Sequence, residues 1–294
     1  MVLEQVEYRK FIFSGHDSFH CRKLWLKKGY DYVKGGNNFN SENAVIKLGV
    51  GKNMVSAIRF WLKAFRIIDA KDNVTKFGDK LLNNLNGYDP YLEDDASLWL
   101  LHYQLVVSNY ASIYNIIINE FRKEKLFFNK EIFINYIKRT SELKRDFPFN
   151  ENTISKDFMV FTNLYKNNLE SKDIEESYSG LLAELDFVKT IKRENDEQYH
   201  IENSERDNLN HAIFLFAILN NPKYGYSISL NALEFEFNSP GSVFALTRKG
   251  LLNKIYEIVE KYDNVSFTDH AGIKELQFKK KESPFTILDR YYDK

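Results

Sequence analysis

The stretch SENAVIKLGVGKNMVSAIRFWLKAFRIIDAKDNVTKFGDKLL, residues 41–82, carries the strongest structural pattern in the chain. Its first part, Glu42 to Leu48, is typical of a short helix that has Ser41 as its N-cap. Gly49-Val50-Gly51 interrupts this helix, and a second helix is predicted from about Asn53 to Ile68. Two helices joined by so tight a turn form a helix-turn-helix pattern.

The second helix of this stretch is amphipathic. Apolar residues at spacings of three and four predict one buried face, made of Val55, Ile58, Leu62 and Phe65. Residues at the same spacings predict a second face that is exposed and basic, made of Ser56, Arg59, Lys63 and Arg66. The following segments, Ile67 to Asp69 and Asn73 to Gly78, predict a small β-wing. Residues 1–88 are therefore predicted to form a winged helix-turn-helix domain.

The charge of the chain is unevenly distributed. The whole sequence has 41 basic and 41 acidic residues, so its formal net charge is zero. Between Arg9 and Lys80, however, fifteen Lys and Arg residues stand against six Asp and Glu residues, a net charge of +9. A polarised chain of this kind presents its basic end as a candidate surface for an anionic partner. We expect double-stranded DNA to be that partner.

The predicted contacts follow from how a recognition helix docks in the major groove. Base edges and nearby phosphates are expected to meet the start of the second helix, at Lys52, Asn53, Ser56 and Arg59. Further phosphate contacts are expected from Lys63 on this helix and from the wing, at Lys71 and Lys76. A basic group nearer the N-terminus could widen the footprint, and consists of Arg22, Lys27 and Lys28. The alternative is a winged helix used for packing or dimerisation, with solvated charges.

The rest of the chain is predicted to be mainly helical with small β-hairpins, an α+β fold. Residues 89–172 are expected to form a helical domain whose first helix, around Ser97 to Leu105, is apolar almost all round and therefore buried. Residues 173–294 are expected to form an α+β, winged-helix-like domain with a hairpin turn at Asp269 to Gly272 and a turn at Pro240-Gly241. Residues 178–206 have four basic and seven acidic residues, which favours packing or a protein partner there over DNA.

No catalytic, metal or cofactor site can be assigned from the sequence. Gly49 to Asn53 resembles part of a phosphate-binding loop, but it joins two helices and lacks the upstream glycine and the Ser/Thr that holds magnesium. His16, Asp17 and His20 are better explained as a hydrogen-bonding cluster than as metal ligands. The acidic run 93–95 precedes an apolar helix, where capping explains it better than a nuclease site does. We expect the chain not to be an enzyme.

Composition gives the expected setting. The one cysteine, Cys21, allows no disulfide framework, and the longest apolar run, 212–219, is far shorter than the ~20 residues of a membrane helix. The first ten residues carry two glutamates and do not read as a signal peptide. These features predict a soluble, cytoplasmic protein.

Three stretches of the sequence form a recognisable set: FSGHDSF (13–19) with WLKKGY (25–30), LGVGKNMV (48–55) with IRFW (58–61), and DPYLED (89–94) with LWLLH (98–102). Together they resemble the bacterial family called "domain of unknown function 4007", and PGSVF (240–244) adds to the likeness. Genes of this family tend to sit beside those for DNA phosphorothioation and related phage defence. The resemblance thus implies an accessory DNA-binding role, as a regulator or targeting subunit, alongside other defence-system proteins. Two alternatives remain open: a protein scaffold for sulfur-modification or ATPase components, and a metal-dependent nuclease.

Overall fold

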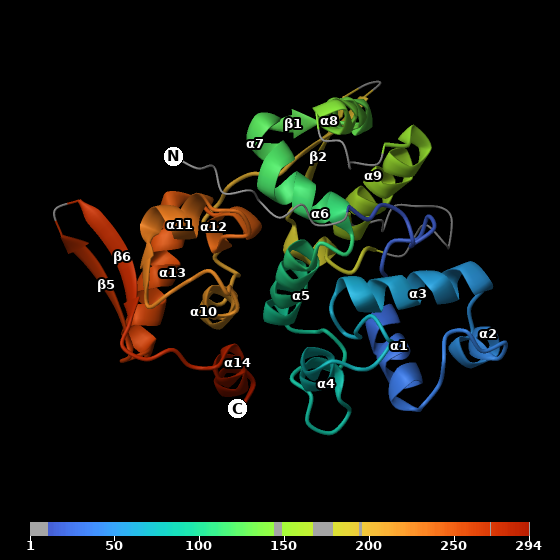
Figure 1. The fold of residues 1–294 in the computed structure, drawn as a ribbon, viewed down its shortest axis with the longest axis horizontal. Helices are drawn as coiled ribbons and strands as arrows, with labels where there is room; N and C mark the ends of the chain where they lie inside the picture. The colour runs from blue at the N-terminus through green and yellow to red at the C-terminus, as the bar shows by residue number, and fades with distance from the viewer. Residues whose placement is uncertain (1–10, 144–148, 167–178, 194–195, 271, 294) are drawn as a thin grey trace.

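The computed structural model describes residues 11–143, 149–166, 179–193, 196–270 and 272–293. The chain is mainly helical, with two small three-stranded antiparallel sheets, so the predicted α+β class is confirmed in this form. In Figure 1 the first helices lie at one side, the C-terminal helices and hairpin lie at the other, and the middle helices lie between them.

The first part of the chain packs three helices around one apolar centre and adds a fourth. Its helices are α1 (Trp25–Lys34), α2 (Ala44–Leu48), α3 (Lys52–Ala64) and α4 (Lys76–Leu82). Gly29 allows α1 to approach α3 closely, because a Cβ there would lie 2.6 Å from a methyl carbon of Leu62. The two helices therefore pack with little space between their backbones.

The middle of the chain is a helical layer around one almost wholly buried helix. The elements are α5 (Asp95–Ser108), α6 (Ser112–Ile116), the π-helical turn η1 (Ile117–Phe121), α7 (Arg122–Glu124), β1 (Phe127–Phe128), α8 (Lys130–Leu143) and α9 (Glu151–Tyr165). Every residue of α5 from Ala96 to Val107 is buried, which confirms the burial predicted for 97–105. Helix α5 is thus the central packing element of the molecule.

A small sheet follows the helical middle. Its chain order is the 3-10 turn η2 (Ala183–Leu185), β2 (Lys189–Arg193) and β3 (Asp196–His200). Strand β3 lies between β1 and β2, so a strand from the helical middle completes the sheet.

The last part of the chain combines five helices with the second sheet. Its elements are α10 (His211–Leu219), β4 (Ser227–Ser229), α11 (Leu230–Phe235), α12 (Pro240–Val243), α13 (Arg248–Lys261), β5 (Val265–His270), β6 (Ile273–Phe278) and α14 (Pro284–Tyr292). Strand β6 is central, and β5 pairs with it along its full length, from Val265 opposite Phe278 to His270 opposite Ile273. The hairpin predicted around the 269–272 turn is therefore present.

One prediction for this part was wrong. Pro240-Gly241 opens the one-turn helix α12 and is not an isolated turn. Ser239 caps that helix by accepting a hydrogen bond from the Ser242 amide, and proline is favoured at the first helical position because it needs no hydrogen-bond partner there.

Polar contacts join the parts of the molecule. Asn115 and Asn119 both donate to the Asn238 side chain, at 3.1 and 2.8 Å, and so connect the helical middle to the last part. Helix α14 returns to α4, where Asp289 bonds Lys80 at 2.5 Å. The three-domain division at 88/89 and 172/173 stays a prediction, and its second boundary lies outside the described residues.

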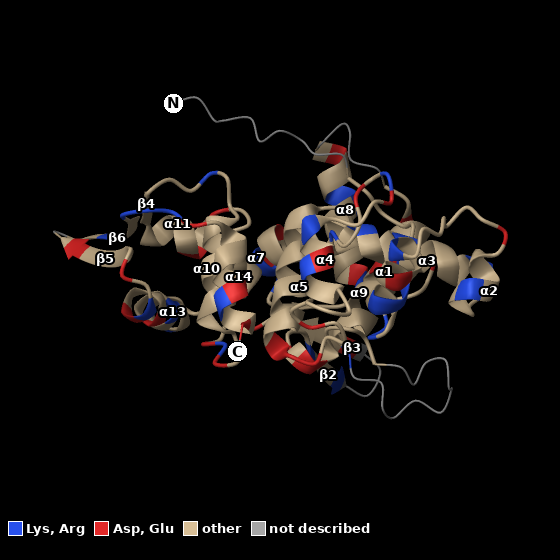
Figure 2. Ribbon diagram, turned by 90° about the horizontal axis from the view of Figure 1, so that it is seen from below, with Lys and Arg blue, Asp and Glu red and all other residues tan. Residues whose placement is uncertain are grey.

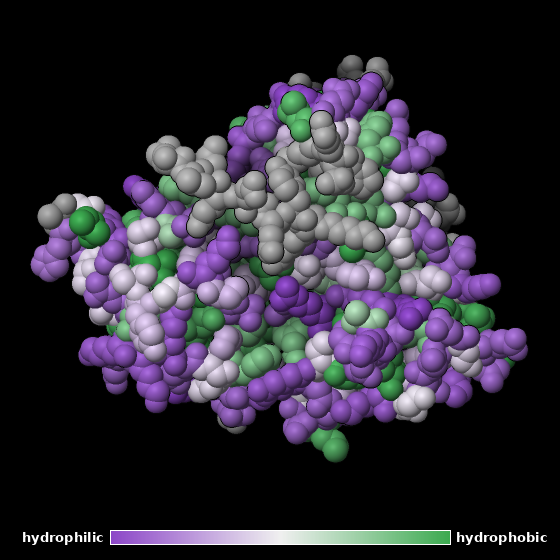
Figure 3. Space-filling view, in the orientation of Figure 1, coloured by the Kyte–Doolittle hydropathy of each residue, from purple (hydrophilic) through white to green (hydrophobic). Residues whose placement is uncertain are grey.

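Apolar side chains line a continuous interior, and hydrophilic residues cover most of the face shown in Figure 3. Among the described residues, none of the helices is both long and apolar enough to span a bilayer.

Candidate nucleic-acid interface

The predicted helix-turn-helix is formed by α2 and α3. Helix α2 ends at Gly49, which has a left-handed backbone (φ 59°), and Gly51 then takes an extended conformation as the N-cap of α3. A left-handed residue other than glycine would cost about 1–2 kcal/mol, so Gly49 allows the abrupt turn. Helix α2 begins two residues later than predicted, with Asn43 as its N-cap in place of Ser41.

Most of the circumference of α3 is buried. The predicted apolar face is confirmed, with Val55 5% exposed and Ile58, Leu62 and Phe65 fully covered. Trp61 is also fully buried and donates its indole N–H to the Phe19 carbonyl at 2.9 Å. What remains exposed is the start of the helix, at Lys52, Asn53 and Ser56.

Asp72 holds the next two cations of α3. Arg59 donates through Nε to Asp72 Oδ1 at 3.0 Å and through Nη2 to Oδ2 at 2.6 Å, a bidentate pair. Lys63 Nζ lies 2.9 Å from Asp72 Oδ1 and donates to the Ala70 carbonyl at 3.0 Å. The side chains of Arg59 and Lys63 are 32% and 12% exposed. The predicted free exposure was therefore wrong for Lys63 and only partly right for Arg59.

The electrostatics of this cluster agree with its geometry. Burial pushes the pKa of Asp72 upward, but hydrogen bonds from Arg59 and Lys63 outweigh it and leave the pKa below its ordinary value. The hydrogen bond from Arg59 in turn raises the pKa of the guanidinium. Asp72 is therefore ionised at neutral pH and neutralises part of the positive charge of these two cations.

The predicted wing is shorter in the structure. Helix α3 ends at Ala64, because Arg66 has a left-handed backbone (φ 57°) that stops the helix before the predicted end at Ile68. Only one bridge, Ile68 with Val74, closes the loop. Thr75 then accepts a hydrogen bond from the Gly78 amide and starts α4, so the second half of the predicted Asn73 to Gly78 strand is helical.

The wing lysines therefore lie on different elements. Lys71 is exposed in the turn, and its backbone amide is fixed by Asp69 at 2.8 Å. Lys76 lies on α4 with its ammonium 4.8 Å from the centre of the Phe285 ring. The structure thus places Lys76 against α14 rather than beside Lys71.

The N-terminal basic group is divided in the same way. Lys28 is exposed on α1. Lys27 is 6% exposed and bonds Asp31 on the same helix, and the Arg22 guanidinium lies 5.3 Å from the centre of the Trp25 ring. Figure 2 shows acidic residues among the basic ones on α1 and α4. The net charge of the segment is therefore not spread over one uniformly basic face.

The FSGHD stretch forms a hydrogen-bonding cluster around the buried His16 and Asp157 side chains. The Ser14 amide donates to both carboxylate oxygens of Asp157 at 3.0 Å, and His16 Nε2 lies 3.3 Å from the same carboxylate. The His16 ring stacks on Trp61, with ring centres 5.7 Å apart. Asp157 lies on α9, 143 residues from Ser14, so its role is not readable from local sequence. This cluster fixes the N-terminal segment against α3 and α9.

The other candidate ligands have structural partners as well. Asp94 caps α5 by accepting from the Ala96 amide at 2.8 Å, as the capping interpretation predicted, and it also accepts from the Tyr291 hydroxyl. Among the described residues, no three His, Cys, Asp or Glu side chains lie close enough together to hold a metal ion.

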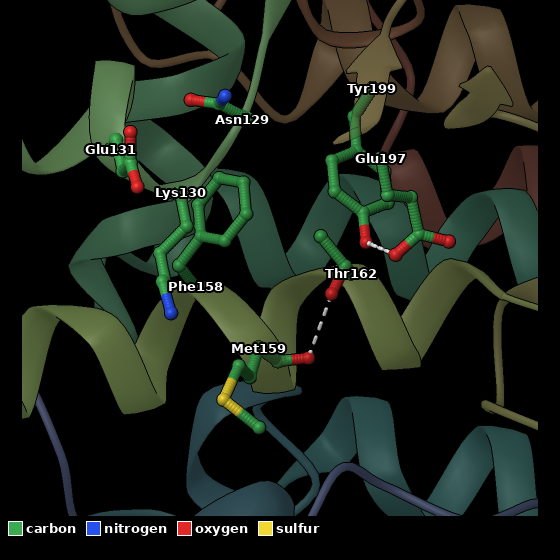
Figure 4. Close-up of a pocket in the computed structure, with 8 residues that line it drawn as sticks. All are labelled: Asn129, Lys130, Glu131, Phe158, Met159, Thr162, Glu197 and Tyr199. Atoms are coloured by element: carbon green, nitrogen blue, oxygen red, sulfur yellow. Dashed lines mark hydrogen bonds between the residues drawn. The ribbon is translucent and has the colours of Figure 1, made fainter. Parts of the chain in front are cut away.

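A separate pocket of about 250 Å³ lies between the start of α8, helix α9 and strand β3 (Figure 4). Its lining is Asn129, Lys130, Glu131, Phe158, Met159, Thr162, Glu197 and Tyr199. Glu197 already bonds Lys166 at 2.9 Å and also accepts from the Tyr199 hydroxyl. The pocket thus has mixed charge and belongs to elements other than α2 and α3.

Comparison with known proteins agrees with this architecture at the level of the whole fold. The chain superposes on a crystal structure described as "Magnesium ion-bound SspB crystal structure", with a TM-score of 0.85, 25% sequence identity, and coverage of 96% of this chain and 88% of the other. A second, described as "SspB crystal structure", matches with a TM-score of 0.82, 25% identity and the same coverage. The chain therefore has an SspB-like fold.

The family assignment comes from sequence. Residues 13–292 match the family described as "Protein of unknown function (DUF4007)", and the chain belongs to this family. The resemblance in the four quoted stretches is thereby confirmed. A comparison with curated protein sequences finds no match.

Proposed function

We propose that this chain binds duplex DNA through the start of α3, as a regulator or targeting subunit of a DNA-modification-linked defence system. One observation carries the proposal: Lys52, Asn53 and Ser56 are exposed together at the first turns of a helix that is otherwise mostly buried. In helix-turn-helix proteins this part of the recognition helix meets the base edges. Lys52 suits a phosphate, while Asn53 and Ser56 can donate to or accept from bases.

The surroundings of the helix support the same docking mode. Lys71 lies in the turn that follows α3 and Lys28 on α1, which packs against α3; both are exposed, and we expect each to contact a phosphate beside the groove. Arg59 and Lys63 lie further along α3, and both are paired with Asp72. Lys27 and Lys76 do not belong to the proposed surface, because Lys27 is buried and Lys76 faces Phe285. The defence setting rests on family membership and the gene neighbourhoods that the resemblance implies.

A DNA-binding titration of the purified chain against salt tests the proposal. Three phosphate contacts predict a slope of about −2.7 for the logarithm of the binding constant against the logarithm of salt concentration. Lys52→Ala should make the slope shallower by about 0.9 and weaken binding on every sequence. Lys249→Ala is the matched control, because Lys249 is also exposed near the start of a helix but bonds Glu205. Equal affinity in all three proteins would place the DNA contacts away from the start of α3, and failure of the wild-type chain to bind DNA would favour the scaffold function.

A second candidate function is magnesium-dependent cleavage of DNA. It is favoured by one observation, the description of a matched structure as magnesium ion-bound. We propose that the chain alone does not cleave DNA. Incubating it with supercoiled plasmid and magnesium or manganese tests this, and nicking that depends on the metal would establish the nuclease function instead.

A further inference from the structure

Two arginines meet where the helical middle contacts the last part of the chain. Arg122 begins α7 and donates to three acceptors: the Ile118 carbonyl at 2.9 Å, Asn203 Oδ1 at 2.6 Å and the Ser242 carbonyl at 3.0 Å. Arg206 donates to the Phe244 carbonyl at 3.1 Å and the Glu202 carbonyl at 2.8 Å. Both guanidiniums therefore gather around the short segment 242–244, and both side chains are half-buried.

Among the described residues, neither guanidinium has a carboxylate partner, because no side-chain carboxylate oxygen of Asp or Glu lies within 4.0 Å of Arg122 or Arg206. Four other arginines each bond a carboxylate, namely Arg59, Arg139, Arg248 and Arg290. Two like charges that are partly removed from water and lack a counter-ion are unfavourable, so a bound anion would stabilise them.

The pKa values of both arginines are lowered, as expected for charges without a paired carboxylate. The pKa of Arg122 is lowered to about 10, mainly by burial and also by the positive charge of Arg206. Burial also lowers the pKa of Arg206 to about 10, against a weaker opposite effect of Asp186 and Glu202. The two arginines thus share one region of positive potential.

Hydrogen-bond donors remain unused around the pair. A guanidinium has five N–H groups, of which Arg122 uses three and Arg206 two. Trp99 Nε1 and Ser242 Oγ, both fully covered by protein, have no partner. The centre of the Trp99 ring lies 5.7 Å from the Arg206 guanidinium, and the Ser242 carbonyl accepts from Arg122. Unpaired donors therefore accompany the uncompensated charge.

We propose that Arg122 and Arg206, together with Asn203, form a binding site for a phosphoryl oxyanion. The planar fork of N–H groups on each guanidinium matches the oxygens of a phosphate group. The negative charge of a phosphate group is spread over several oxygens, so two guanidiniums can share it. The phosphoryl group belongs either to a free phosphate or nucleotide, or to the backbone of a nucleic acid. The site shares no residue with the start of α3, so it stands independently of the proposed DNA surface.

Thermal unfolding of the whole chain in inorganic phosphate, with chloride added to keep the ionic strength constant, tests the site. Wild-type protein should show a saturable rise in Tm that chloride alone does not produce, because a ligand that binds only the folded state stabilises it. Asn203→Asp is the informative variant. Asn203 is exposed and accepts from Arg122, so an aspartate of the same shape supplies the missing counter-ion without disturbing the core.

In Asn203→Asp the phosphate-dependent rise should disappear, while the Tm in phosphate-free buffer should equal or exceed that of wild type. Arg206→Lys keeps the charge but loses the fork, and should weaken phosphate binding at least about fivefold. Arg290→Gln is the control, since Arg290 already bonds Glu282, and should respond to phosphate as wild type does. No phosphate-dependent rise in wild type, or an equal rise in wild type and Asn203→Asp, overturns the proposal.

A second arm identifies the source of the phosphoryl group. If it belongs to DNA, Asn203→Asp lowers the affinity for a short duplex, and inorganic phosphate competes with that duplex. If it belongs to a free phosphate or nucleotide, DNA affinity in this variant equals that of wild type. Because the first arm contains no DNA, failure of DNA binding at α3 leaves its result intact.

Discussion

Two regions of the molecule each pair a short helix with a longer amphipathic one, yet they differ in how their charges are arranged. In the N-terminal unit, α1 to α4, the first turns of α3 leave Lys52 exposed, and one β-bridge forms the wing. In the C-terminal unit, α10 to β6, a full hairpin follows α13. There Arg248 bonds Glu234 at 2.8 Å, and Lys249 bonds Glu205 at 2.7 Å.

The comparison shows that the order of elements in a unit and the availability of its cations for DNA are separate properties. The C-terminal unit contains a three-stranded sheet with β6 between β4 and β5, and the winged-helix-like arrangement expected for it from the sequence stays a prediction. Its candidate recognition helix nevertheless starts with two cations that acidic neighbours already hold. The N-terminal unit has the poorer wing but the freer charge. Because phosphate binding depends on releasing counter-ions, the region with free cations is the better candidate for DNA.

The largest expected effect compares charge reversal in the two units. Lys52→Glu with Lys71→Glu should weaken DNA binding by on the order of a hundredfold, because two phosphate contacts are replaced by repulsion. Arg248→Glu with Lys249→Glu, the same change of charge on α13, should leave DNA affinity within about twofold. Fluorescence anisotropy with a labelled duplex measures both, and circular dichroism checks that each variant is folded. A larger loss in the α13 variant would reverse the assignment of the two units.

The second prediction concerns how the C-terminal unit is attached. His102 on α5 is fully buried and bonds the Val243 carbonyl and the Tyr165 hydroxyl, each at 2.8 Å. Its pKa is lowered from 6.5 to about 3, mainly by burial and also by the charges of Arg206 and Arg122, against the effect of the Val243 hydrogen bond. The imidazole is therefore neutral in the folded protein throughout the pH range where the unfolded chain binds a proton.

The sign of the effect follows from linkage. Protonation favours the unfolded state, so this contribution is absent above pH 6.5. Below it, the free energy of unfolding falls by up to about 1.4 kcal/mol per pH unit. Urea unfolding between pH 7.5 and 5 measures this fall. His102→Gln should be less stable than wild type at pH 7.5 but should lose less stability on acidification. His200→Gln, a change in a partly exposed histidine of β3, should keep the wild-type fall. Equal pH dependence in wild type and His102→Gln would contradict the assignment.

The third prediction concerns Asp72 and would sharpen the contrast in free charge. Asp72→Asn removes the carboxylate that holds Arg59 and Lys63, so both cations become available to phosphates. DNA affinity should rise several-fold, and the salt slope should become steeper by up to about 1.8. Asp69→Asn is the matched control, because Asp69 lies in the same turn but bonds the Lys71 and Asn73 amides rather than a cation of α3. An equal rise in DNA affinity in both variants would mean that the change in net charge alone explains the effect.

The cluster around Asp72 also shows which features could be predicted from the sequence and which could not. Periodicity and turn formers predicted the buried face of α3, the buried helix α5 and the β5–β6 hairpin, because these depend on local spacing of residues. It gave the wrong exposure for Lys63, because Asp72 reaches that lysine only through its left-handed backbone (φ 66°). The partner of Ser14 and His16 is 143 residues away from Ser14, and the Arg122–Arg206 pair joins segments of different parts. Contacts of this kind depend on tertiary packing and leave no local signal.

The smallest expected effect separates two lysines that the predicted wing placed together. Lys71→Ala should weaken DNA binding modestly and make the salt slope shallower by about 0.9, because Lys71 is exposed in the turn beside α3. Lys76→Ala should leave DNA affinity and slope unchanged, since its ammonium lies over the Phe285 ring. It should instead lower the free energy of unfolding by about 0.5–1 kcal/mol, the usual strength of an exposed cation–π contact. Paired titrations and urea unfolding of the two variants distinguish these outcomes. Equal losses of affinity would mean that α4 and α14 also face the DNA, which would extend the interface toward the C-terminal unit.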